Sequence, residues 1–211
     1  MPLDTRSHLA TAAAAICALG LSACAPGMEE MDPPADAETE EYGVSMSTTT
    51  IGGHPAWAHF TNPLAYADGY DHTILDEAIR LIDDTPSGAT IRAAIHSLTV
   101  NGVASALIDA KTRGVMVQVV EDGSDEFEED ATPGKLAAAL GAKHVYCGDG
   151  QKGGNYACIT ADPSGIMHIK LFTFSQTKDP SGALQSNVVW FGSANMTHAT
   201  GGKTFNNTIT I

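Results

Sequence analysis

Two short segments of the chain carry the residue types that phosphate chemistry needs. His168 and Lys170 stand two positions apart, and Ser193 and Asn195 follow in a Gly-Ser-x-Asn turn. In an extended strand, side chains two positions apart point to the same face, so His168 and Lys170 are expected side by side. An imidazole supplies a nucleophile, a lysine supplies fixed positive charge, and hydroxyl and amide groups supply neutral donors. Together these groups can support attack on a phosphodiester.

The order of these residues resembles the HKD motif of the phospholipase D superfamily, H-x-K-x4-D-x6-G-S-x-N. The resemblance covers residues 59–211, including AIRLIDDTPSGATIRAAIHSL and ALIDAKTRGVMVQVVEDG, and is to the first half of a secreted bacterial phospholipase D-like protein. Ser175 stands where the family has Asp, and the polar segment QTKDPSGALQSN lengthens the spacing to Gly192. Only one copy of the motif is present, whereas most of the family carries two.

The resemblance also implies a role for each residue. His168 would attack phosphorus and form a phosphohistidine intermediate, Lys170 and Asn195 would hold the non-bridging oxygens, and Ser193 would add a hydroxyl donor. No metal or other cofactor is expected, because Lys170 supplies the positive charge. Asn207 is a further candidate for substrate binding, with a cap between loop and strand as the alternative.

The same mechanism requires a second histidine, which protonates the leaving oxygen and then activates water or an alcohol. The sequence contains no second H-x-K. One expectation is a homodimer in which each subunit contributes one motif to a shared site. The other is a truncated front half of a two-motif enzyme, because the chain stops on the apolar segment NNTITI. His96 ends a predicted strand and could face the site, but packing at the core or rim is the preferred interpretation.

Apolar periodicity along the domain alternates between helical and strand patterns. Helices are expected at about residues 73–82, 101–114 and 132–141, and strands at 89–96, 115–120, 144–147, 156–160, 167–174, 188–191 and 208–211. The strand at 115–120 is almost continuously apolar, which is typical of a strand covered on both faces. We therefore predict a single α/β domain with a mixed sheet flanked by helices, as the resemblance also implies.

The amino terminus has the pattern of an exported lipoprotein. Residues 1–23 form a predicted signal peptide that ends in a lipobox-like Leu-Ser-Ala before Cys24. Cys24 is predicted to carry the lipid that anchors the protein in the bacterial cell envelope; an ordinary signal peptide is the alternative. Residues 24–53 are acidic and poor in large apolar side chains, so they are predicted to be a disordered tether to a domain at 54–211.

Charge is unevenly distributed. The formal net charge is −14, and the excess of acidic residues lies in the tether and in the segment 121–130. The rest of the domain is close to neutral and has no basic stripe, so nucleic acid is an unlikely partner. The acidic segment lacks the spacing of a calcium loop and is expected to be solvated.

The cysteines and the remaining histidines are not expected to take part in catalysis. Cys147 and Cys158 are predicted to form a disulfide in an exported chain. Neither has a second ligand at the spacing of a zinc site, so no metal is expected. Five histidines are expected at the surface or in loops: His54, His59, His72, His144 and His198.

These observations favour a lipid-anchored phosphodiesterase that acts on phospholipid head groups, by hydrolysis or by transphosphatidylation. A nuclease of the same superfamily is the second hypothesis, and the absence of a basic groove counts against it. The third is a catalytically inactive half with a binding or structural role, which Ser175 and the single motif favour.

Overall fold

The structure, a computed structural model, describes residues 46–211. The predicted signal peptide, the proposed lipid site at Cys24 and the first part of the predicted tether lie outside the described residues. Part of the predicted tether forms regular structure. Residues expected to end the tether instead form the edge strand β1, Met46–Ile51, which pairs with His54–Phe60. Its Thr-rich sequence favours a strand, although no side chain of this strand is buried.

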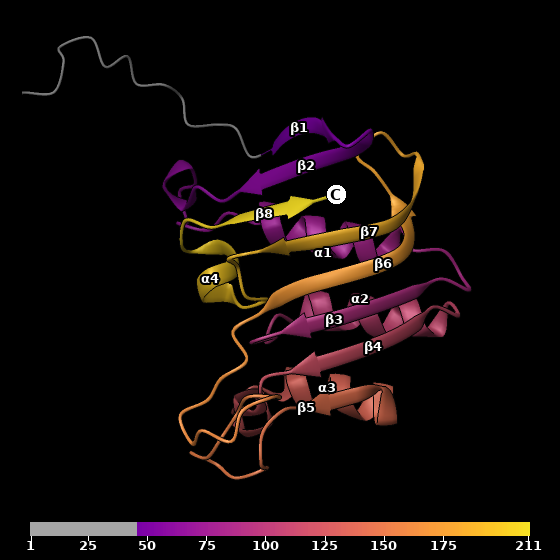
Figure 1. The fold of residues 1–211 in the computed structure, drawn as a ribbon. Helices are drawn as coiled ribbons and strands as arrows, with labels where there is room; N and C mark the ends of the chain where they lie inside the picture. The colour runs from indigo at the N-terminus through magenta and orange to yellow at the C-terminus, as the bar shows by residue number, and fades with distance from the viewer. Residues whose placement is uncertain (1–45) are drawn as a thin grey trace, which may run out of the picture. The chain divides into compact units, whose positions relative to one another are not determined.

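Eight strands form one mixed sheet in the order β1-β2-β8-β7-β6-β3-β4-β5 (Figure 1). After β1 they span His54–Phe60 (β2), Thr90–Ile95 (β3), Met116–Glu121 (β4), His144–Tyr146 (β5), Lys170–Lys178 (β6), Leu184–Gly192 (β7) and Asn207–Thr210 (β8). The pairs β3–β4 and β4–β5 are parallel, and the others are antiparallel. Parallel neighbours need crossover connections, which here contain helices. The predicted class, an α/β domain with a mixed sheet, is confirmed.

The three longer helices lie on one face of the sheet (Figure 1). They are α1 (Thr73–Asp83), α2 (Asn101–Thr112) and α3 (Ala131–Leu140), followed by the short α4 (His198–Gly202) and accompanied by 3-10 turns at Pro63–Ala65, Gly123–Phe127 and Gly141–Lys143. On α1, Ile74, Ala78, Leu81 and Ile82 recur at the spacing of one helical face, and all four are buried. Helix α3 ends where Gly141 adopts a φ of +58°, as the sequence predicts.

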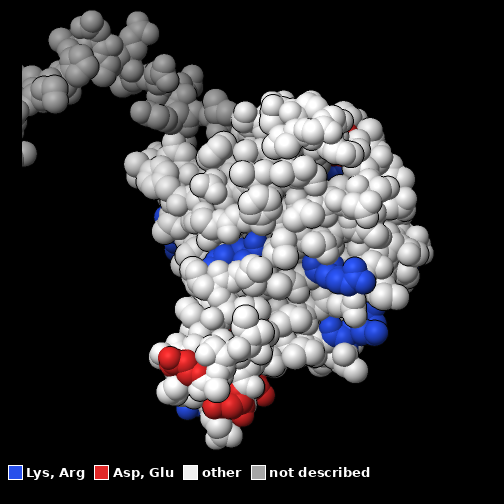
Figure 2. Space-filling view, in the orientation of Figure 1, with Lys and Arg blue, Asp and Glu red and all other residues white. Residues whose placement is uncertain are grey.

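Alternating burial along the strands shows which face the helices cover. In β4, Val117 and Val119 are buried, whereas the side chain of Met116 is 52% exposed. The prediction that both faces of this strand are covered is therefore wrong, because the helices cover only one. The opposite face carries few charged groups (Figure 2). On that view, acidic atoms gather at the end where the loop between β5 and β6 lies in Figure 1.

The predicted strand at residues 156–160 is also wrong. The segment is loop, and the backbone N–H groups of Tyr156 and Ala157 donate to the carbonyl oxygen of Gly165 and to Oδ1 of Asn155. A strand needs a neighbour for these groups. Here local turns satisfy them.

Candidate active site

The predicted site residues come together at one edge of the sheet. Strand β6 starts at Lys170, which pairs with Ile95 at the end of β3. Strand β7 ends at Gly192, which pairs with Thr208 near the start of β8. A Cβ on Gly192 would lie 2.2 Å from the carbonyl oxygen of Asn207, so only glycine permits this close approach. The ends of β3, β4 and β7 thus meet the starts of β6 and β8, as in many α/β sites.

His168 precedes strand β6 rather than lying within it, because the strand begins at Lys170 and not at Met167 as predicted. The Nζ atom of Lys170 donates to the carbonyl oxygen of His168 at 3.3 Å. Lys170 is only 4% exposed, and burial lowers the pKa of its ammonium group. Within residues 46–211 no carboxylate forms an ion pair with it. The site therefore holds a desolvated positive charge that is not neutralised by the protein.

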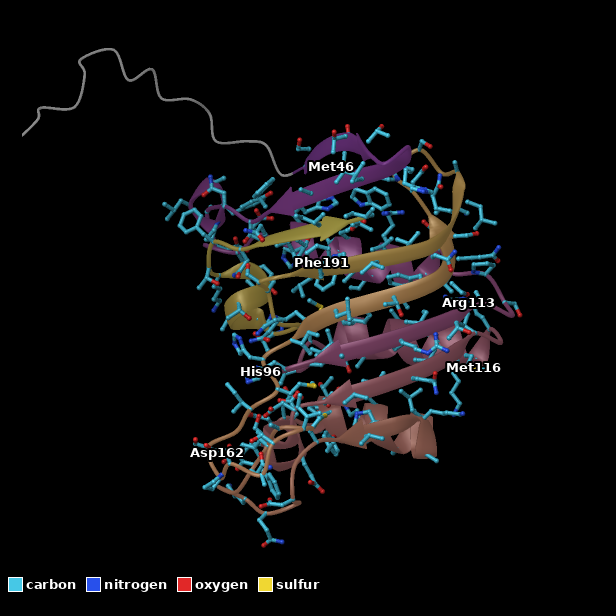
Figure 3. The ribbon with its side chains drawn as sticks, viewed as in Figure 1. Met46, His96, Arg113, Met116, Asp162 and Phe191 are labelled. Atoms are coloured by element: carbon cyan, nitrogen blue, oxygen red, sulfur yellow. A yellow bond between two sulfur atoms is a disulfide. The ribbon has the colours of Figure 1, made fainter. Side chains whose placement is uncertain are left out.

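A second imidazole lies in the site. The rings of His96 and His168 meet edge to face, with centroids 4.7 Å apart, and His96 lies beside the end of β3 (Figure 3). Burial lowers the pKa of His96; Lys170 and His168 act in the same direction, while Asp122 opposes them. This contact agrees with the alternative that His96 faces the site. A signal was available, because the residue after a parallel strand lies at the edge where such sites form.

Asp122 fixes the segment that leads into His168. Its Oδ2 accepts from the backbone N–H of Met167 at 2.5 Å, and its Oδ1 accepts from the N–H and hydroxyl of Ser124. Its own N–H donates to the carbonyl oxygen of Ile95. Asp122 is fully buried. Sequence reasoning missed this residue because it treated the surrounding acidic segment as solvated.

The carboxylates of Glu121 and Asp125 lie beneath the same edge and are also buried. Oδ2 of Asp125 accepts from the N–H of Leu98 at 2.7 Å, and burial, with Glu121 adding to it, raises the pKa of Asp125 to about 7. Glu121 lies 3.4 Å from Nε2 of His144, and burial raises the Glu121 pKa while His144 opposes the shift. The solvated reading of the acidic segment is therefore wrong for Glu121, Asp122 and Asp125. The surface reading is wrong for His144, whose side chain is 2% exposed, and for His59, which is 7% exposed.

Asn195 enters the site from the turn after β7. Its backbone N–H donates to Oγ1 of Thr200 at 3.1 Å, which fixes the turn on α4. Its Oδ1 is buried and has no hydrogen-bond partner in the described part of the chain. A side-chain interaction of hydrogen-bond type with Asn195 nevertheless raises the pKa of His96 against the stronger effect of burial. The two side chains are therefore close, although no bond of normal hydrogen-bond geometry joins them. The structure thus brings Asn195, His96, His168 and Lys170 into one group.

Ser193 and Asn207 are not part of that group. The hydroxyl of Ser193 donates to Oδ1 of Asn206 at 2.7 Å and accepts from the N–H of Asn207 at 3.1 Å. Both Ser193 and Asn207 are exposed. These bonds join the turn after β7 to the start of β8, which matches the cap alternative for Asn207. Substrate binding by Ser193 and Asn207 stays a prediction.

The predicted disulfide is present between Cys147 and Cys158. Both sulfur atoms lie close to Sδ of Met167, at 3.7 and 3.8 Å. The disulfide loop therefore packs against the residue that precedes His168. Among residues 46–211, no group of three or more His, Cys, Asp or Glu side chains could hold a metal ion.

Ser175, at the usual Asp position of the motif, lies away from the site. It lies five positions from Lys170 along an extended strand, which corresponds to about 16 Å. Its Oγ accepts from the N–H of Thr90 at 2.8 Å, at the opposite end of β3. The residue at this position therefore joins two strands and does not contact the histidines.

Comparison with known proteins identifies the family. The model described as "Cardiolipin synthase, PLD-like domain" matches residues 79–211, which include His96, His168, Lys170 and Asn195. The chain belongs to the phospholipase D-like family. The resemblance inferred from the motif is confirmed, and with it the assignment to a superfamily of phosphodiesterases. No curated protein shows a significant match to the sequence.

Solved structures of similar fold include a phospholipase D family member, Nuc, from Salmonella typhimurium. It is 19% identical, with a TM-score of 0.49, and the match covers 74% of this chain and 82% of that one. NucT from Helicobacter pylori is 22% identical, with a TM-score of 0.49, and 74% and 84% are covered. Polyphosphate kinase from Porphyromonas gingivalis is 15% identical, with a TM-score of 0.45, and 74% and 23% are covered. In the described part of this phospholipase D-like chain, no helix is both long and apolar enough to span a bilayer.

Proposed function

We propose that the protein cleaves phosphodiesters in phospholipid head groups through a phosphohistidine intermediate. A ring nitrogen of His168 bonds to phosphorus while the bond to the leaving oxygen breaks, and a second histidine gives that oxygen a proton. The second histidine then takes a proton from the water or alcohol that attacks phosphorus, and the bond to His168 breaks. Lys170 and Asn195 stabilise the charge on the non-bridging oxygens.

The buried, unpaired ammonium of Lys170 beside His168 carries this proposal. An isolated buried charge is costly, and folded proteins keep one where a ligand or transition state of opposite charge uses it. A phosphodiester anion supplies that charge. In a desolvated site the attraction is stronger than in water, and it increases as negative charge develops on the oxygens.

Exposed apolar side chains near the nucleophile support a lipid substrate. Ile166 and Ile169 flank His168 and are 53% and 42% exposed, and Ile159 in the same loop is 99% exposed. Phe205, just before β8, is 65% exposed. Such residues suit an amphiphilic substrate or its surface. The domain outside the tether and residues 121–130 is close to neutral, and the absence of a basic stripe counts against a polyanionic nucleic acid.

The catalytic acid is proposed to be His168 of a second copy of the chain. In-line displacement needs an acid on the side of phosphorus opposite His168, and a two-fold pairing of these sheet edges would supply the partner's histidine. Mixing His168→Ala subunits with wild-type subunits tests this. A shared site needs the histidines of both subunits, so activity should fall with the square of the wild-type fraction, whereas subunits that act alone would lose activity only in proportion to that fraction.

Anchoring belongs to the same proposal. Lipid on Cys24 would hold the enzyme at the envelope membrane, close to its substrate. Mass spectrometry of the mature amino terminus tests this directly. A lipid-modified cysteine is expected, and an unmodified residue at any other position would refute the anchor.

The activity itself is tested by comparing phosphatidylcholine vesicles, bis(p-nitrophenyl) phosphate and single-stranded DNA as substrates. The protein should begin at or before Met46, since a later start would delete β1. We expect turnover of the lipid and of the small diester. His168→Ala should abolish this turnover, and His54→Ala, which changes an exposed histidine, should retain it. Turnover of DNA alone would favour the nuclease. Turnover that survives His168→Ala would refute the mechanism.

A further inference from the structure

We infer that His96 is a positioning residue of this site, which orients the carboxamide of Asn195 toward the phosphate and holds the imidazole of His168 in place. This role rests on the proposed function. His96 lies outside the H-x-K and Gly-Ser-x-Asn segments, and it reaches the site from the segment that follows β3.

Backbone pairing brings His96 and Asn195 together. The N–H of Met196 donates to the carbonyl oxygen of Ser97, and the N–H of Thr99 donates to the carbonyl oxygen of Met196, both at 3.0 Å. A parallel bridge joins Leu98 to Met196. In this register Asn195 lies opposite Ser97, the residue after His96, so His96 and Asn195 leave the contact from adjacent positions, and the two side chains interact. Asp125 reinforces the arrangement by binding the N–H of Leu98.

The two side chains offer complementary atoms. Nδ1 of His96 and Oδ1 of Asn195 are both buried, and neither has a hydrogen-bond partner within residues 46–211. An amide oxygen only accepts, whereas an imidazole protonated on Nδ1 donates. Asn195 also raises the pKa of His96, as an acceptor beside the ring does. Hydrogen bonds in an empty site are often too long and shorten when substrate binds.

Closing this bond determines which way the carboxamide faces. With Oδ1 of Asn195 held by His96, both N–H groups of the amide are left for the non-bridging oxygens of the phosphate. In the reversed orientation, the amide would direct its oxygen, the negative end of its dipole, toward the phosphate anion. His96 therefore selects the orientation of Asn195 that stabilises the transition state.

The contact with His168 excludes a direct acid–base role for His96. The ring centroids are 4.7 Å apart. An in-line displacement places the phosphorus between nucleophile and acid, with each catalytic atom about 3 Å from the group that it attacks or protonates. Two rings in van der Waals contact leave no space for a phosphoryl group. His96 instead packs on one side of the nucleophile and limits its rotation.

Two substitutions of His96 separate the effect of its hydrogen-bond donor from the effect of its aromatic ring. His96→Phe keeps the aromatic contact with His168 but lacks the donor, and His96→Asn keeps a donor near the position of Nδ1 but lacks the ring. We expect kcat on bis(p-nitrophenyl) phosphate to fall by roughly 10- to 100-fold in His96→Phe, because orientation of Asn195 is lost, with a smaller change in KM. His96→Asn should recover at least about fivefold of that loss, since its amide can donate to Asn195.

The exposed His54→Phe serves as the matched control, and thermal melts confirm that each variant is folded. A wild-type kcat in His96→Phe would overturn the inference. So would a His96→Asn variant that is as slow as His96→Phe while both are folded, because a side chain that acts only through packing gives no rescue by a donor.

A spectroscopic measurement tests the geometry without turnover. In ¹⁵N spectra of the histidine-labelled protein, the His96 resonances, assigned by their loss in His96→Phe, should show a proton on Nδ1. Asn195→Ala should shift that signal. A proton on Nε2 would overturn the inference. A wild-type protein with the Nδ1 proton but without His168-dependent turnover would refute the proposed function and leave the contact between His96 and Asn195 intact.

Discussion

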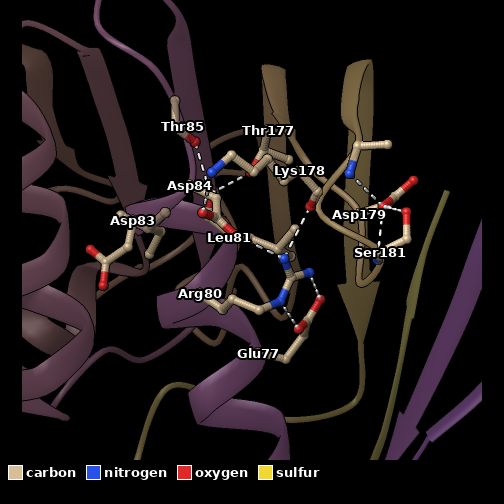
Figure 4. A network of polar contacts seen from close by, with 12 residues as sticks. Glu77, Arg80, Leu81, Asp83, Asp84, Thr85, Thr177, Lys178, Asp179 and Ser181 are labelled. Atoms are coloured by element: carbon tan, nitrogen blue, oxygen red, sulfur yellow. Dashed lines mark hydrogen bonds and ion pairs between the residues drawn. The ribbon is translucent and has the colours of Figure 1, made fainter.

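The two ends of strand β6 carry opposite kinds of polar structure. At the far end, Arg80 forms ion pairs with Glu77 at 2.7 Å and Asp84 at 3.1 Å, and it also donates to the carbonyl oxygen of Lys178 (Figure 4). Glu77 additionally accepts from Nε1 of Trp57, and Lys178 pairs with Asp84. Each charge there has a partner.

At the near end, the ammonium of Lys170 has no carboxylate partner among the described residues. Nδ1 of His96 and Oδ1 of Asn195 are buried without hydrogen bonds. Buried polar groups are normally satisfied, and exceptions concentrate where a ligand completes them. One end of the strand thus stabilises the fold through paired charges. The other end leaves buried polar groups unpaired, as the proposed phosphate site requires, and the buried carboxylates of Asp122 and Asp125 bind the backbone around it.

The strongest test of this comparison applies one substitution at both ends. Lys170→Met should lower kcat at least about 1,000-fold, because the charge that stabilises the transition state is lost. It should leave the free energy of unfolding unchanged or raise it, since a desolvated charge is removed. Lys178→Met, on the same strand, should keep kcat within about twofold. Kinetics and urea denaturation measure both, and equal losses of activity would break the comparison.

The converse test removes a carboxylate from the far end. Glu77→Gln should lower the free energy of unfolding by about 2 kcal/mol, because the partly buried guanidinium of Arg80 loses its closest partner. The kcat of the folded variant should stay within about twofold. The exposed Glu126→Gln is the control and should be neutral. A large loss of kcat at temperatures where Glu77→Gln is folded would contradict the separation of the two ends.

Asp125 sharpens the comparison through pH. Burial raises its pKa from 3.8 to about 7. As pH rises, Asp125 therefore ionises in the unfolded state before it ionises in the folded state. The free energy of unfolding falls between about pH 4 and 7, and the full loss remains above pH 7. Asp125→Asn removes that effect and should gain about 2 kcal/mol relative to wild type at pH 8, with little difference at pH 4. Denaturation at both values measures it, with the exposed Asp109→Asn as control. An equal difference at both pH values would be inconsistent with a buried titrating carboxyl.

The smallest effect is expected at Ser175, the position where the motif usually has Asp. Ser175→Asp should change kcat by less than about twofold and stability by less than about 1 kcal/mol, because the residue is exposed and lies on the far half of β6. Ser175→Ala, which removes the acceptor for Thr90, is the companion variant. A gain of more than tenfold in Ser175→Asp would show that the serine limits catalysis.

Local patterns were sufficient to predict the helices and most of the strands. The i, i+4, i+7 spacing of α1 and the Gly141 stop of α3 depend on a few neighbouring residues, and the structure has both. Edge strand β1 was missed because its six residues bury no side chain, so no apolar alternation marked it. The segment 156–160 has a strand-like composition but no partner strand, and partners are a property of the tertiary fold.

Spacing within two short segments was sufficient to assign the family and to predict His168, Lys170 and Asn195 as site residues, because neighbouring positions determine which residue types occur together. Only the tertiary structure brought His96 and Asp122 beside them, since residues from β3 and the end of β4 meet β6 through sheet order rather than through sequence distance. The tertiary structure also determines which of the acidic side chains are buried. The sequence predicted a solvated acidic segment, but the fold buries Asp122 and Asp125 of that segment next to the candidate site.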